Sequence, residues 1–243
     1  MYKIRQRIRY SETDSTGKLS MQGLLRIFQD CSYMHAEDRG RGVEFQAETH
    51  CAWFLLSWCI RLFEPPTLSE YVTVETYFYY MHGSIARKWM SMKNDEGKEI
   101  AHADTIWGYV DTERDVPVDC PPNLWSSEDF AELPENAKSE SRKIKVSDKS
   151  ENTVTEKLPE FAIYPYLIDT NRHANNVRFT ELAMRLADCE VGCRSLRAEF
   201  LRQAFLDSTV FPCVYQSNDK KIVSMNNSKG RPFAVFEFTK TPD

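Results

Sequence analysis

The side chains best suited to acid–base chemistry gather in one short stretch of the second half of the chain. Asp169, Asn171, His173 and Asn175 alternate along it, and Asn176 follows directly. In an extended backbone alternate side chains point to one side, so we expect these groups to share a face. Histidine exchanges protons near neutral pH, and a neighbouring carboxylate or amide can set its tautomer or polarise a carbonyl. The spacing therefore predicts a site for general acid–base chemistry.

A purely structural interpretation of the same residues is also open. Asn175 or Asn176 could be the N-cap of a helix, Asp169 could close a turn, and His173 could be a solvated loop residue. A metal site is less favoured, because only Asp169 and His173 are good ligands and no third ligand is near them in the sequence. We therefore expect neither a metal nor another cofactor.

An earlier stretch has the same plan. The segment from Asp14 to Ser20 precedes a first helix as the segment from Asp169 to Asn175 precedes a second, at an offset of 155 residues. A turn signal at 94–97 recurs at 227–230, at an offset of 133 residues, so the first copy carries an insertion, for which residues 36–52 are the candidate. Lys18 stands where the second copy has His173. We infer that the first copy is a scaffold and that the second is active.

Each copy is expected to be one helix followed by an antiparallel meander, with one strand ahead of the helix. The first helix follows Ser20 and ends at two glycines, and its apolar stripe is Met21, Leu24, Leu25, Phe28 and Cys31. The second helix runs through 177–186. Strands are expected over 2–10, 53–63, 71–81, 85–93 and 99–110, and again over 161–168, 194–203, 209–216, 220–225 and 232–239.

A sheet wrapped around one helix buries the helix stripe, so the order of elements predicts an α+β fold, a tandem (double) hotdog. The expected division is an N-terminal hotdog over residues 1–130, a proline-rich linker with short helical pieces over 131–160, and a C-terminal hotdog over 161–243. The linker carries a charged run at 140–145.

Composition excludes several classes of protein. The 243 residues are 42% hydrophobic and 28% charged, with a net charge of −5, which is unlike disordered or collagenous chains and disfavours nucleic acid as a partner. The longest apolar run, at 52–56, is too short to cross a membrane, and no targeting segment is recognised. The seven cysteines form no CxxC pair, so we expect reduced thiols and a cytoplasmic protein.

The active stretch is identified by its similarity to one family. The D-x-N-x-H-V-N-N motif of the acyl-ACP thioesterases, a double-hotdog family, resembles the run Asp169-Thr170-Asn171-Arg172-His173-Ala174-Asn175-Asn176. The runs at 9–14, 24–30 and 53–55 look like the opening of that family, and the resemblance covers essentially the whole chain. It implies hydrolysis of fatty acyl-ACP, which releases a free fatty acid and ends chain elongation. Two alternatives stay open: hydrolysis of acyl-CoA or another thioester, and a non-catalytic acyl-binding relative.

The resemblance also implies roles for particular residues. Asp169, Asn171 and His173 would be catalytic, together with an acid on the following strand, but that position is Gln203 here. Glutamine can hold a water molecule but cannot accept its proton. Glu199, the nearest acid, is four residues away, roughly 13 Å along an extended strand, which disfavours it as a substitute.

The substrate implied is an acyl chain on the phosphopantetheine arm of acyl carrier protein. Asn175 and Asn176 would contact it in the second copy, and Leu25, Phe28 and Trp53 would line the chain's slot in the first. Because the carrier is acidic, docking requires a local basic surface. Its candidates are Arg39, Arg41, Arg142, Lys143, Lys145, Arg172 and Arg178. A homodimer through sheet edges is left open.

Overall fold

The computed structural model describes residues 1–135, 137, 141–146, 154–217 and 220–239. The chain divides into two compact units. Unit 1 consists of residues 1–19 and 23–140, and unit 2 consists of residues 20–22 and 141–243. Within the described part of the chain, no helix combines the length and apolarity needed to cross a membrane.

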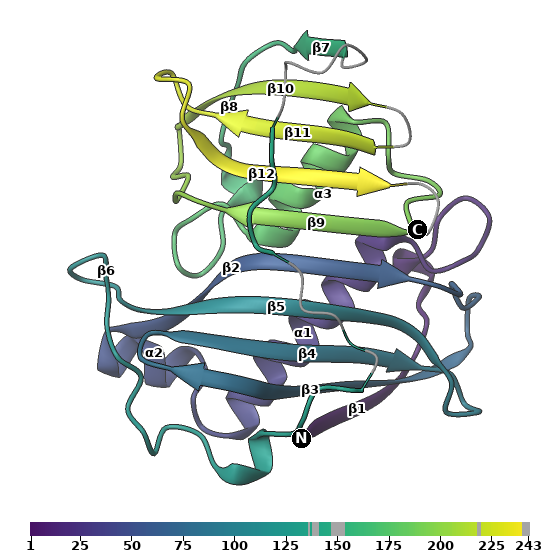
Figure 1. Ribbon diagram of the computed structural model, residues 1–243, viewed down its shortest axis with the longest axis vertical. Helices are drawn as coiled ribbons and strands as arrows, with labels where there is room; N and C mark the ends of the chain where they lie inside the picture. Colours follow the sequence, from purple (N-terminus) through teal and green to yellow (C-terminus); the bar gives the residue numbers. More distant parts are fainter. Residues whose placement is uncertain (136, 138–140, 147–153, 218–219, 240–243) are drawn as a thin grey trace. The chain divides into compact units, whose positions relative to one another are not determined.

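Unit 1 is built on one antiparallel sheet with the strand order β1-β3-β4-β5-β2 (Figure 1). Its strands are β1 (Tyr2–Arg7), β2 (Cys51–Leu62), β3 (Tyr71–His82), β4 (Ile85–Lys93) and β5 (Glu99–Asp111), and the short β6 (Val116–Pro117) pairs with β5. Two helices and two 3₁₀ turns complete the unit: η1 (Tyr10–Glu12), α1 (Met21–Asp38), α2 (Val43–Thr49) and η2 (Ser127–Asp129).

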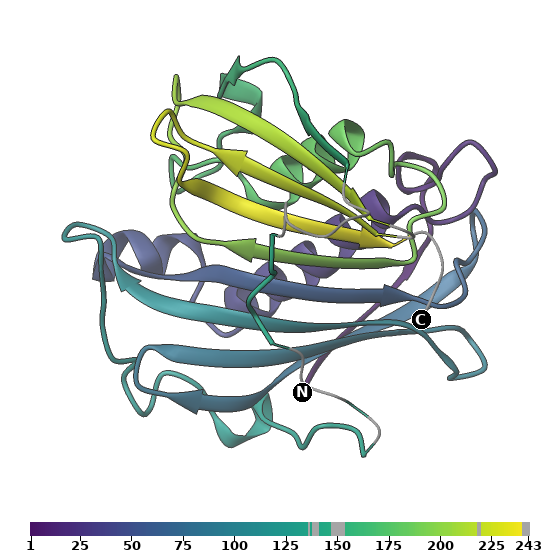
Figure 2. The same ribbon diagram turned by 45° about the horizontal axis from the view of Figure 1, so that its top comes forward.

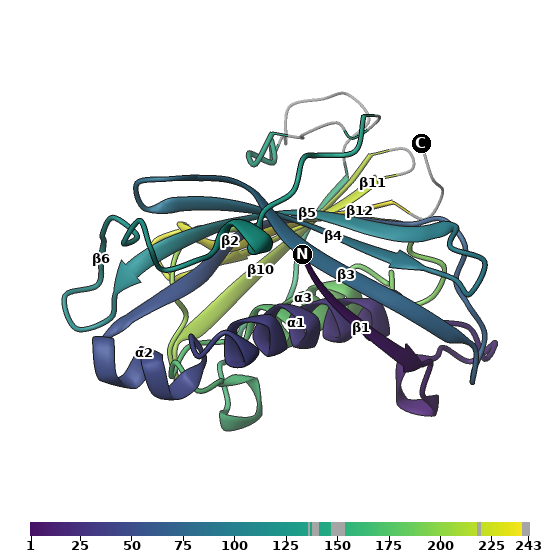
Figure 3. The same ribbon diagram turned by 90° about the horizontal axis from the view of Figure 1, so that it is seen from below.

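Helix α1 lies across one face of this sheet, as Figure 3 shows. Leu24, Leu25, Phe28 and Cys31 are at most 1% exposed, so the stripe expected from the sequence is buried. The helix ends before Gly40, which has a left-handed backbone with φ of +64°. One sheet and one helix therefore share the core of the unit.

Unit 2 repeats this arrangement on a smaller scale (Figure 2). Its sheet has the order β9-β12-β11-β10-β7, and β8 pairs with β10. The elements are β7 (Val154–Lys157), β8 (Phe161–Ala162), η3 (Pro165–Leu167), α3 (Asn176–Leu186), β9 (Ser195–Phe200), β10 (Thr209–Ser217), β11 (Lys220–Asn226) and β12 (Pro232–Thr239). The buried side of α3 packs on this sheet, with the Phe179 and Phe236 rings 6.0 Å apart between centroids.

The two turn matches found in the sequence are confirmed by hydrogen bonding. In the first copy Asp14 N donates to Lys18 O, and Gly17 N donates to Asp14 O. In the second copy Asp169 N donates to His173 O, and Arg172 N donates to Asp169 O. The 3₁₀ turns η1 and η3 are also 155 residues apart. At the second offset, Asn94 N donates to Lys98 O as Asn227 N donates to Arg231 O. The segment proposed as the insertion, 36–52, contains α2 and the end of α1.

Most expected strands are observed within one or two residues of their expected ends, but the strand expected over 161–168 is wrong. Only Phe161 and Ala162 are in a strand, because Pro165 begins the 3₁₀ turn η3. The strand expected over 2–10 is also shorter, because η1 begins at Tyr10. Strand β7 lies inside the segment 131–160, which was expected to be a linker.

Candidate active site

The acid–base stretch of unit 2 is a tight turn that Asp169 closes. Asp169 N donates to His173 O at 2.9 Å, and Asp169 Oδ1 accepts from the N–H of Asn171 at 2.9 Å. The expectation of an extended stretch is therefore wrong, because the carboxylate binds the amide two residues further on and bends the chain. The alternative in which Asp169 forms an Asx turn is confirmed. Asp169, Asn171 and His173 still lie in one half-buried turn.

The turn leads directly into helix α3, for which Asn175 is the N-cap. Its Oδ1 accepts from Val177 N at 3.1 Å and from Arg178 N at 3.2 Å. Asn176 is the first residue of the helix, and its carbonyl accepts from the Thr180 hydroxyl at 2.6 Å. The N-cap interpretation of Asn175 is confirmed, and its side-chain carbonyl oxygen accepts hydrogen bonds from the first turn of the helix.

The loop after β9 runs beside the turn and brings Gln203 to it. Ala174 N donates to Ala204 O at 2.8 Å, and His173 forms an antiparallel bridge with Phe205. The His173 and Phe205 rings meet edge to face, with centroids 5.0 Å apart. Gln203 is half-buried, two residues from the bridged phenylalanine. Backbone hydrogen bonds thus place the loop that carries Gln203 beside the turn that carries Asp169, Asn171 and His173.

Glu199 is held in a different role. It is 8% exposed, and its Oε2 accepts from the Ile144 N–H at 3.1 Å, while Oε1 lies 3.7 Å from Arg142 Nε. This carboxylate therefore fastens the segment at 142–144 to strand β9.

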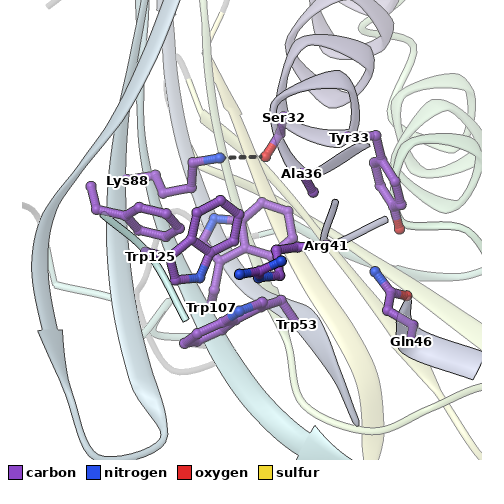
Figure 4. A pocket seen from close by; sticks show the side chains of 10 residues that line it. Ser32, Tyr33, Ala36, Arg41, Gln46, Trp53, Lys88, Trp107 and Trp125 are labelled. Atoms are coloured by element: carbon purple, nitrogen blue, oxygen red, sulfur yellow. Dashed lines mark hydrogen bonds between the residues drawn. The ribbon is translucent and has the colours of Figure 1, made fainter. Parts of the chain in front are cut away.

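Unit 1 contains a pocket between α1 and the sheet, about 440 Å³ in volume when the space open to solvent is included. Figure 4 shows its lining, which consists of Ser32, Tyr33, Ala36, Arg41, Gln46, Trp53, Phe78, Lys88, Trp107 and Trp125. Trp53 is the one substrate-contact residue expected from the sequence in this half that lines the pocket. Leu25 and Phe28 are 1% and 0% exposed and belong to the core beside it.

A buried polar network adjoins this pocket. Lys88 Nζ donates to Ser32 Oγ at 2.9 Å and lies 3.4 Å from His35 Nδ1. On its other side, His35 Nε2 lies 2.9 Å from Asp129 Oδ1, which also accepts from Arg39 Nε at 2.7 Å. Since Lys88 can only donate, His35 is neutral with its proton on Nε2.

Burial sets the charge states of this network. It lowers the pKa of His35 to about 4, with a further contribution from the positive charge of Lys88, and it lowers the pKa of Lys88 to about 8. Burial alone would raise the pKa of Asp129, but the hydrogen bonds from His35 and Arg39 outweigh it and lower that pKa to about 2. At neutral pH the network therefore holds an ammonium, a neutral imidazole and a carboxylate.

A helix packed on a large antiparallel sheet fits a hotdog-type α+β fold, and the family match given next makes the chain a thioester hydrolase. The profile of the acyl-ACP thioesterase N-terminal domain matches residues 1–127, more than half of the sequence. The chain belongs to the acyl-ACP thioesterase family, and it hydrolyses the thioester of fatty acyl-ACP. The acyl-CoA and non-catalytic alternatives are not favoured.

Solved structures of similar fold support the architecture. An acyl-ACP thioesterase from Bacteroides thetaiotaomicron has a TM-score of 0.84 at 18% identity, covering 98% of this chain and 96% of that one. A putative oleoyl thioesterase from Lactobacillus plantarum has a TM-score of 0.78 at 18% sequence identity, and the match covers 100% of this chain and 97% of that one. The 12:0-ACP thioesterase from Umbellularia californica has a TM-score of 0.76 at 13% sequence identity, and the match covers 100% of this chain and 97% of that one. These identities establish the fold alone, and no curated protein matches the sequence significantly.

Proposed function

We propose that hydrolysis takes place at the Asp169–His173 turn of unit 2. His173 removes a proton from a water molecule, which attacks the thioester carbonyl carbon. Asn171 and a backbone N–H at the start of α3 stabilise the oxyanion that forms. The C–S bond then breaks, the proton passes to the departing pantetheine sulfur, and the free fatty acid leaves. Asp169 orients His173, and Gln203 positions the water.

The observation that carries this proposal is the pairing of the Gln203 loop with the turn. Backbone bonds fix both segments, so Gln203 and His173 are held in place before any substrate binds. Such preorganisation is what an acid–base site requires. The first copy keeps the turn but has Lys18 in place of the histidine, as a scaffold copy would.

The two copies are proposed to be a tandem double hotdog with divided roles. Residues 1–130 bind the acyl chain, 161–243 carry the catalytic residues, and 131–160 connect them, with β7 of that segment paired to β10. The matching turns, at offsets of 155 and 133 residues, support a duplication, and the aromatic pocket of unit 1 supports the assignment of the acyl chain. In this arrangement Trp53 contacts the chain, Leu25 and Phe28 support its pocket from the core, and Asn175 and Asn176 contact the thioester end.

Partner and compartment are also proposals. The carrier is acyl carrier protein, with hydrolysis ending chain elongation in fatty acid biosynthesis, and neither nucleic acid nor membrane takes part. The seven free cysteines support a reducing compartment such as the cytoplasm. Formation of a homodimer through a sheet edge can be tested by sedimentation of the purified protein.

The decisive experiment compares His173→Ala with Lys18→Ala in a thiol-release assay on acyl-ACP and acyl-CoA. Lys18 occupies the equivalent turn position in unit 1, so it is a matched control for any effect on folding. We expect His173→Ala to lose nearly all hydrolysis and Lys18→Ala to keep it, with acyl-ACP the better substrate. Near-normal turnover by His173→Ala would exclude His173 as the base.

A further inference from the structure

The pocket of unit 1 is aromatic, but several of its polar groups are hydrogen-bond donors. Lys88 contributes an ammonium, Arg41 a guanidinium and Gln46 an amide. The indole N–H groups of Trp53 and Trp125 are buried and have no hydrogen-bond partner among the described residues. A pocket meant only for a methyl-terminated chain gains nothing from these groups, since each unpaired buried donor costs about 1–3 kcal/mol.

Both charged residues that line the pocket, Lys88 and Arg41, are basic. None of the described lining residues is an aspartate or a glutamate. Arg41 donates to the backbone carbonyls of Leu124, Arg39 and Gly40. The carboxylate of Asp129 lies beyond the imidazole of His35, on the side away from Lys88.

Lys88 is the most unusual of these groups. It is 4% exposed, and its ammonium lies 5.0 Å from the centroid of the Phe78 ring, besides contacting Ser32 and His35. A buried ammonium without an adjacent anion carries a desolvation cost that a bound carboxylate would offset. Its pKa of about 8 still leaves it mostly protonated at neutral pH.

We infer that this pocket selects acyl chains whose far end carries a carboxylate, which pairs with Lys88 and accepts hydrogen bonds from Trp125 and Trp53. The inference rests on the proposed function, since it takes the pocket of unit 1 as the acyl-chain site. The chain itself packs against the Trp53, Phe78 and Trp107 rings. A hydroxyl at the same place is a weaker ligand, because it has no charge to pair with the ammonium.

The test compares three acyl-ACP substrates of equal length, which end in a methyl, a hydroxymethyl or a carboxylate group. We expect kcat/KM to be highest for the carboxylate and lowest for the methyl end. Lys88→Met should reduce kcat/KM for the carboxylate-ended substrate by about 30-fold or more, so that its advantage over the methyl-ended substrate is lost. Lys93→Met is the control, because Lys93 is on the same strand, pairs with Glu75 and does not line the pocket.

A binding measurement on the unmodified protein makes the test independent of folding in the variant. Octanedioate should quench the tryptophan fluorescence of the pocket at lower concentrations than octanamide does, because octanamide has no carboxylate. Equal binding of these two ligands, together with equal rates for the three substrates, overturns the inference while hydrolysis stands. If the protein releases thiol from none of the substrates, the proposed function itself fails, and the octanedioate titration still decides whether the pocket binds carboxylates.

Discussion

Gly17 and Arg172 occupy the same position in two copies of one turn. Both have a left-handed backbone, with φ of +77° and +63°, and in each the N–H donates to the carbonyl of the aspartate that closes the turn. Glycine adopts this conformation freely, whereas a residue with a Cβ is strained by about 1–2 kcal/mol. The copy proposed to be catalytic thus has backbone strain that the other copy lacks, which is common at functional sites.

Arg172→Gly is therefore expected to stabilise the protein by about 1 kcal/mol, and Gly17→Ala to destabilise it by a similar amount. No atom lies within 4 Å of a Cβ built on Gly17, so its effect would come from the backbone alone. Thermal unfolding measures both effects, and we expect the melting temperatures of the two variants to shift by about 2–4 °C in opposite directions. Shifts of the same sign would show that Arg172 makes stabilising contacts in the fold.

Two substitutions of Asn175 distinguish its role as the N-cap of helix α3 from its proposed contact with substrate. Asn175→Ala should lower the free energy of unfolding by about 1 kcal/mol, because two N–H groups lose their acceptor. Asn175→Ser keeps the cap and should retain stability. If the amide also contacts substrate, Asn175→Ser will raise KM without unfolding the helix; an unchanged KM would leave Asn175 with the capping role alone. Urea unfolding and steady-state kinetics provide the two measurements.

The acid sensitivity of unit 1 should depend on His35. Its pKa of about 4 in the folded protein lies below the ordinary value of 6.5, so the unfolded chain binds a proton first as the pH falls. Stability conferred by the neutral imidazole is fully present above pH 6.5 and is lost progressively toward pH 4.

His35→Gln removes this titration and keeps an N–H that can reach Asp129. We expect the unfolding free energy of the wild-type protein to fall more steeply than that of His35→Gln between pH 6.5 and 4, measured in urea at several pH values. Parallel curves would mean that His35 titrates normally in the folded state.

The secondary structure was largely predictable, because local patterns determine it. The stripe at Leu24, Leu25 and Phe28 predicts α1, and the asparagine–glycine turn signals predict the hairpins at 94–97 and 227–230. The shape of the catalytic turn was not predictable from alternation, because an Asx turn also places polar residues at every second position.

The pocket was hidden for a different reason. Alternation along β4 puts Lys88 on the same face as the buried Ala86, Met90 and Met92, but a lysine side chain is rarely buried, so its charge indicates exposure to solvent. Only the packing of α1 on the sheet buries it against Ser32 and His35. Arg41 and Trp125 come from loops whose positions no periodic pattern encodes.

Gln203 gives the sharpest test of the chemistry. In the proposed mechanism Gln203 holds the attacking water and His173 is the sole base. Gln203→Glu should therefore add a second proton acceptor and raise kcat by about tenfold or more, whereas Gln203→Ala should lower kcat. The pH–rate profile of Gln203→Glu should gain a group that titrates near the ordinary glutamate pKa of about 4.3. Glu199→Gln is the control, because Glu199 binds the 142–144 segment, and its kcat should not change. If neither Gln203 variant alters kcat while both remain folded, the water does not lie at this side chain, and the reaction depends on the Asp169–His173 turn alone.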